Sequence, residues 1–79
     1  MIAEEDKLSY DLEQLQFAED RIKRSRDRVN YQRKLRDAFA DGSTERAHAD
    51  RTLANFEALH QLMEKFCHQM RDKVNSRSM

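Results

Sequence analysis

The sequence predicts an all-α protein, an antiparallel hairpin of two long helices. The chain has 79 residues with one Gly and no Pro, too few turn residues for a β-rich fold. Apolar residues recur every three or four positions along two long segments, as they do on one face of a helix. One strong turn signal, at residues 41–44, separates the segments. A chain of this length forms one domain.

The first helix is expected over about residues 5–40. Its apolar stripe contains Leu8, Leu12, Leu15, Ala18, Ile22, Val29 and Phe39, and Ser25 and Gln32 continue the same spacing. Leu35 lies beside this heptad-like stripe. Such a helix is roughly 50 Å long at about 1.5 Å per residue.

The turn at 41–44 reads Asp-Gly-Ser-Thr. Gly42 can adopt the left-handed conformation that ends a helix. Ser43 or Thr44 can cap the next helix, and Glu45 suits its first turn.

The second helix is expected over about residues 45–74, followed by a polar tail, 75–79, that frays. A stripe with spacings of four and three contains Ala49, Leu53, Phe56, His60, Met63, Cys67, Met70 and Val74. Leu59, Leu62 and Phe66 widen this stripe beyond the seam that a hairpin needs.

Two helices that meet along one seam leave the wider stripe in water, so we expect a homodimer that forms a four-helix bundle. Ten large or well-placed apolar side chains are the candidates for core and interface: Leu15, Ile22, Val29, Phe39, Leu53, Phe56, Leu59, Met63, Phe66 and Met70.

The formal net charge of zero hides a strong segregation along the chain. Residues 1–20 hold seven acidic residues and one basic residue, whereas residues 21–36 hold eight basic residues and one acidic residue. In the hairpin, residues 1–20 should lie beside the more basic end of the second helix. Two first helices that met antiparallel near residue 20 would place each acidic half against a basic half, which favours an antiparallel dimer.

Several function classes find no support in the sequence. A single Cys excludes a disulfide scaffold, and no nucleophile–base pair or phosphate loop is recognisable. We therefore expect no enzyme activity and no cofactor. No segment resembles a membrane span or a secretory signal, and the free thiol indicates the cytoplasm.

Two binding alternatives remain open. Glu57 and His60 have the Glu-x-x-His spacing of di-metal bundles, but they should face Ser25 between two arginines, which disfavours a cation. His60 is then a polar core residue that bonds across the hairpin, and Cys67 a small buried hydrophobe. The basic stretch 21–36 could bind nucleic acid through Arg21, Lys23, Arg24, Arg28, Arg33 and Lys34. These basic residues spread around the helix, so a solvated face is the preferred interpretation.

Residues 18–63 also carry a family resemblance. Ala18-Glu19, Ile22, Val29, Gln32-Arg33, Asp41-Gly42, Thr44 and Leu53-x-x-Phe56-Glu57 resemble a group of short helical-hairpin proteins of soil alphaproteobacteria. The resemblance implies a bacterial cytoplasmic hairpin and supplies no catalytic residue. The sequence therefore predicts a non-enzymatic protein that acts through protein–protein contact, by self-association and with a possible regulatory partner.

Overall fold

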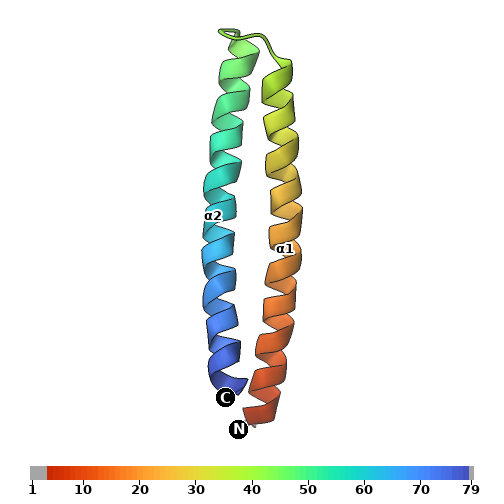
Figure 1. Cartoon of the computed structure of the whole chain (residues 1–79), viewed down its shortest axis with the longest axis vertical. Coiled ribbons are helices and arrows are strands. Elements are labelled where there is room, and N and C mark those ends of the chain that lie inside the picture. The colour runs from red at the N-terminus through yellow and green to blue at the C-terminus, as the bar shows by residue number, and fades with distance from the viewer. Residues whose placement is uncertain (1–3, 79) are drawn as a thin grey trace.

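The chain forms a hairpin of two helices, as a computed structural model shows (Figure 1). The structure describes the backbone of residues 4–78 and the side chains of residues 6–77. Helix α1 spans Glu4–Ala38 and helix α2 spans Thr44–Ser78, 35 residues each. They run antiparallel along a molecule 58 Å long and 21 Å by 14 Å across. The predicted all-α hairpin is thus confirmed.

The two helices meet along a seam with heptad spacing. On α1 the least exposed positions follow one another at intervals of three and four, and α2 repeats the pattern from residue 46 to residue 77. The buried apolar members of the seam are Ala18, Val29, Ala49, Leu53, Cys67 and Val74. Predicted core residues Leu15, Ile22, Phe56, Met63 and Met70 lie on the same seam and are half-buried.

The turn between the helices uses the residues that the sequence marks for it. Gly42 has φ of 78°, the left-handed region in which a side chain is strained. Ser43 caps α2, because its Oγ accepts a hydrogen bond of 3.1 Å from the backbone N–H of Arg46.

The C-terminal ends of both helices differ from the prediction. α1 stops at Ala38 rather than near residue 40, and the N–H of Phe39 closes the last turn by donating to the carbonyl of Arg36. Phe39 therefore lies beyond the helix, 38% exposed, and does not continue the apolar stripe. α2 continues to Ser78, so the expected frayed tail is helical up to that residue. Met79 lies outside the described residues.

Asp11, rather than Leu12, occupies the seam near the open end of the hairpin. Asp11 is 3% exposed, whereas Leu12 is 49% exposed. The guanidinium of Arg77 lies 2.7 Å from Asp11 Oδ2, and Lys73 Nζ lies 3.9 Å from Oδ1. These two bases stabilise the buried carboxylate, although Oδ2 has no partner with hydrogen-bond alignment among the described residues. The same contact secures the last turn of α2, which explains why the helix extends beyond residue 74.

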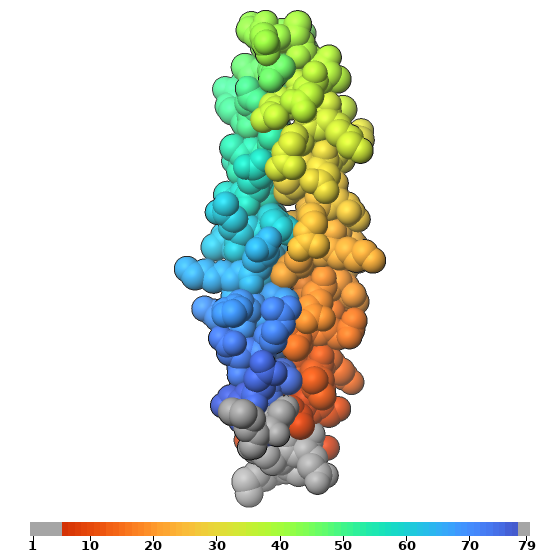
Figure 2. Space-filling view, viewed as in Figure 1, coloured from red at the N-terminus to blue at the C-terminus, as the bar shows by residue number. Residues whose placement is uncertain are grey.

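The core is thin, because each helix covers only one side of its partner. The space-filling view shows the two helices in contact along their length, with no third layer over this face (Figure 2). Among the side chains that the structure describes, no large one is completely buried. Neither α1 nor α2, over the residues described, has the length and apolar character needed to cross a membrane.

Candidate interaction surface

The two sides of the seam differ, and one of them is closed by ion pairs. We call it the closed face, defined by Glu19–Arg71 at 3.3 Å, Arg33–Glu57 at 3.5 Å and Arg36–Asp50 at 3.7 Å. The first residue of each pair lies on α1 and the second on α2. Pairs this exposed contribute about 0–1 kcal/mol each, so their main effect is to fix the alignment of the helices.

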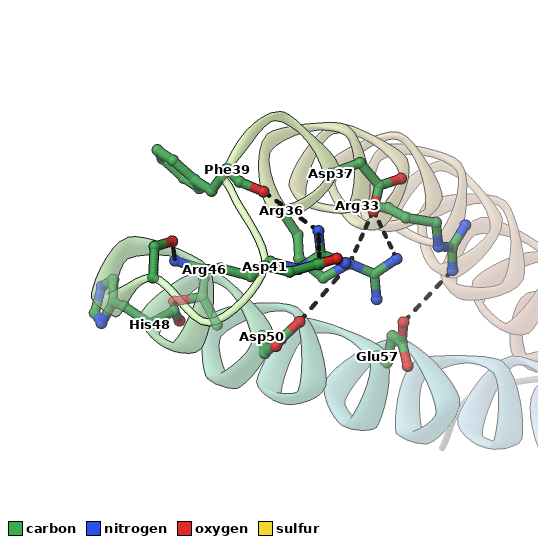
Figure 3. A network of polar contacts seen from close by, with 11 residues as sticks. Arg33, Arg36, Asp37, Phe39, Asp41, Arg46, His48, Asp50 and Glu57 are labelled. Atoms are coloured by element: carbon green, nitrogen blue, oxygen red, sulfur yellow. Dashed lines mark hydrogen bonds and ion pairs between the residues drawn. The ribbon is translucent and has the colours of Figure 1, made fainter.

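Figure 3 shows that the pairs nearest the turn belong to a larger network. Arg36 also contacts its neighbour Asp37 at 2.9 Å. Arg46 reaches back from α2 to the carboxylate of Asp41 at 2.8 Å and to the carbonyl of Phe39 at 3.3 Å. Arg46 therefore ties the residues that precede Gly42 to the first turn of α2.

A polar group crosses the middle of the seam. His60 Nδ1 lies 2.9 Å from Ser25 Oγ, and His60 Nε2 lies 2.5 Å from Glu64 Oε1. An ionised carboxylate only accepts, so Nε2–H donates to Glu64, and Nδ1 shares a hydrogen bond with the Ser25 hydroxyl. The predicted bond from His60 across the hairpin is present, and it joins Ser25.

This serine–histidine–carboxylate order also occurs in hydrolases; the sequence placed Ser25 opposite His60, but the part of Glu64 appears only in the structure. The surroundings differ from those of a nucleophile. Ser25 is 7% exposed in the interior of α1, where the nearby backbone N–H groups are used in the helix and cannot bind an oxyanion. The arrangement holds the buried Ser25 and the half-buried His60 in register.

The predicted metal candidates do not converge. Glu57 points to Arg33, while His60 is occupied by Ser25 and Glu64. Over the described part of the chain, no group of three or more His, Cys, Asp or Glu side chains could hold a metal ion. Cys67 is buried as a free thiol, 3.8 Å from the guanidinium of Arg71.

On the other side of the seam lies an apolar groove, and we call this side the open face. Its floor is Ala18 and Met63, and the groove encloses about 430 Å³. Four exposed side chains line it, Phe17 at 58%, Leu59 at 48%, Leu62 at 65% and Phe66 at 56%. Leu59 and Phe66 therefore lie off the seam, as the sequence predicts. Large apolar side chains gathered in one groove are typical of a contact surface.

Arginines border this groove on α1. The guanidinium of Arg21 lies 6.0 Å from the centre of the Phe17 ring. Arg21, Arg24 and Arg28 line an adjoining hollow of about 260 Å³ together with Phe17, Ser25 and Met63. None of these three arginines forms an ion pair within the described residues, whereas Arg33 pairs with Glu57 on the closed face.

Comparison with protein-family models, curated proteins and solved structures finds no match.

The residues predicted to contact nucleic acid therefore do not all lie on one face of the hairpin. Arg21, Arg24 and Arg28 lie together on the open face, and Arg33 lies on the closed face. Lys23 and Lys34 are exposed, with no ion pair to any residue that the structure describes. Phe17, which precedes the seam residue Ala18, lines the groove although it is not among the residues predicted for the core and interface. The sequence could have indicated Phe17 as a large aromatic residue that lies one position before the seam and four positions before Arg21.

Proposed function

We propose that this chain is a non-enzymatic helical protein that self-associates through its open face, and that this contact is how it acts. The observation that carries the proposal is the groove lined by Phe17, Leu59, Leu62 and Phe66 on one side of the seam only. Ion pairs cross the opposite side, and the hollow of about 650 Å³ there is lined mainly by polar and charged side chains, so the two sides are not equivalent. A four-helix bundle follows if two hairpins stack with their grooves together.

The thin core supports a second copy of the chain as the partner that fills the groove. A hairpin of 79 residues buries little apolar surface, and small domains of this kind commonly gain the remainder by oligomerisation. Stacking on the open face would cover all four groove side chains. Complete burial of a Leu or Phe side chain stabilises by about 1.5–3 kcal/mol, so four from each copy provide a substantial driving force.

The charge of the molecule supports a protein partner over nucleic acid. The formal net charge is zero, so the long-range attraction to a polyanion is weak. The arginines of the open face also border an apolar groove, and an apolar groove gains more from another helix than from phosphates. We place this assembly in the reducing cytoplasm, where the free thiol of Cys67 is stable.

Leu62→Glu tests the proposal, with Leu12→Glu as the matched control. Both leucines are exposed in the single chain, but Leu62 lines the groove and Leu12 lies off it. In sedimentation-velocity runs at tens of micromolar, we expect a dimer for the wild type and Leu12→Glu. We expect a monomer for Leu62→Glu, because a charge buried against apolar surface is costly.

A monomeric wild type at these concentrations would contradict the proposal, as would a Leu62→Glu variant that dimerises as well as the wild type. Circular dichroism checks that each variant keeps its helices.

The same protein preparation is also tested for bound nucleic acid. Retention of RNA or DNA that falls steeply with salt, and that Arg24→Ala abolishes, would instead support the nucleic-acid alternative.

A further inference from the structure

We infer that the hollow beside the groove binds a small oxyanion of the phosphate type, which lies between the two copies of the dimer and stabilises their association. The inference rests on the proposed self-association and adds a ligand to the same surface. The three arginines that line the hollow, Arg21, Arg24 and Arg28, hold the ion. Guanidinium groups suit this role, because their planar donors pair with two phosphate oxygens at once.

The arrangement of the three arginines is the first argument. They lie at positions i, i+3 and i+7 of α1, so they share one side of the helix. Neighbouring members are about 4.5 and 6 Å apart along the helix axis, so two long side chains can reach one ion. Phe17, Ser25 and Met63 complete the lining of the hollow, which encloses about 260 Å³. This small volume suits an inorganic ion.

The absence of a counterion is the second argument. Over the residues that the structure describes, no acidic side chain lines either the groove or the hollow. Two acids lie close by in sequence, but Asp20 lines a separate hollow with Leu12 and Glu13, and Asp27 lines neither space. The acids that define the closed face are already paired across the hairpin. The positive charge beside the groove is therefore open to an anion from solution.

Self-association makes this charge costly. Arg21 lines both spaces, and its guanidinium lies 6.0 Å from the centre of the Phe17 ring, so a copy that covers Phe17 also covers Arg21. The second copy presents the same two spaces in either orientation of the hairpin, and they supply no acid. Like charges would then be withdrawn from water together, which is unfavourable unless an anion accompanies them. An ion held by both copies removes this cost.

Sedimentation velocity in two buffers of equal ionic strength, one of sodium chloride and one of sodium phosphate, tests the inference. An ion that binds only the dimer strengthens association by mass action. Phosphate at about ten times its own dissociation constant should therefore lower that of the dimer about tenfold. A dimer of equal strength in both buffers would overturn the ion site and leave self-association intact. A wild type that is monomeric in both buffers would overturn both proposals.

Arg24→Gln/Arg28→Gln separates the site from a general effect of phosphate. Phosphate also strengthens apolar association, because it is excluded from protein surfaces. The variant should dimerise in chloride at least as tightly as the wild type, since less like charge meets at the interface, and phosphate should change its dissociation constant by less than about twofold. An equal response to phosphate in the variant and the wild type would overturn the site.

Lys23→Gln/Arg26→Gln is the matched control. It removes two positive charges from the same part of α1, but neither residue lines the groove or its adjoining hollow. Arg26 instead lines the hollow that contains Glu64 and Arg71. The wild-type response to phosphate should persist in this variant. Its loss would indicate net charge rather than the three arginines and would contradict the site. Circular dichroism checks that both double variants keep their helices.

Phosphorus-31 NMR of inorganic phosphate gives a readout that does not depend on sedimentation. The wild type should broaden or shift the phosphate resonance, and Arg24→Gln/Arg28→Gln should not. A resonance that the wild type leaves unchanged would contradict binding.

A short oligothymidylate strand, at the same concentration of phosphate groups, distinguishes a free ion from a nucleic-acid backbone. The strand should not strengthen the dimer, because the site closes between two copies. A dimer that responds to the strand and not to inorganic phosphate would overturn the free ion and favour the nucleic-acid alternative.

Discussion

At the scale of single residues, the seam tolerates the two buried polar side chains, Ser25 and Asp11, because each has a partner. Ser25 and His60 satisfy each other across the middle of the hairpin, and Glu64 occupies the second ring nitrogen of His60. Near the open end, Asp11 is held by Arg77 and Lys73. Buried polar pairs stabilise little in themselves, but they penalise a slipped register in which each partner would meet an apolar residue.

Ser25→Ala tests the cost of leaving such a pair incomplete. Nδ1 of His60 loses its hydrogen-bond partner while the ring remains largely buried, with 13% of its side chain exposed. The free energy of unfolding should fall by about 1–3 kcal/mol. Urea denaturation followed by circular dichroism measures it.

Ser25→Ala/His60→Leu is the companion variant. It removes both polar groups from the seam, so most of the lost stability should return. If Ser25→Ala were as stable as the wild type, the hydrogen bond between Ser25 and His60 would not contribute to folding.

At the scale of elements, the turn decides how two equal helices are joined. Gly42 takes the left-handed conformation, and Ser43 starts α2 directly afterwards. Arg46 then ties Asp41 of the turn to α2, and Arg36 pairs across the helices with Asp50 (Figure 3). The turn thereby places α2 in the register that pairs Ser25 with His60.

Gly42→Ala should destabilise the hairpin by about 1 kcal/mol, because alanine is strained at φ of 78°. A Cβ at this position would meet nothing within 4 Å, so steric contact adds nothing to that cost. Gly42→Asn is the control, since asparagine adopts the left-handed region more readily and should lose less. Thermal unfolding of the two variants side by side measures the difference, and equal melting temperatures would contradict this account.

At the scale of the whole molecule, stability and self-association should be coupled. The seam alone buries no large side chain completely within the described region, and the groove leaves four more in water. If a second copy covers the groove, association stabilises the folded chain by mass action.

The melting temperature should therefore rise as protein concentration increases a hundredfold. Leu62→Glu should melt lower and at a temperature independent of concentration, whereas Leu12→Glu should behave like the wild type. A wild-type melting temperature that did not change with concentration would indicate that the hairpin is stable on its own.

The sequence by itself determined the features that depend on neighbouring residues. Local spacing, the cap at Ser43 and the conformational freedom of Gly42 predict two helices and one turn, because these are short-range effects. The stripe on the second helix predicts its seam from Ala49 to Val74, including His60 and Cys67. Even the facing of Ser25 and His60 follows from counting outward from the turn.

Only the tertiary structure decided what depends on the opposite helix. Asp11 lies four residues before Leu15 and Leu12 lies three residues before it, so helical spacing fits either residue on the seam. Lys73 and Arg77 of α2, which contact Asp11, favour the acid there. The same contact extends α2 to Ser78, where sequence polarity suggested fraying. The structure also separates a closed face from an open one. The two sides of a heptad seam look alike in one helix and differ only when the residues across it are known.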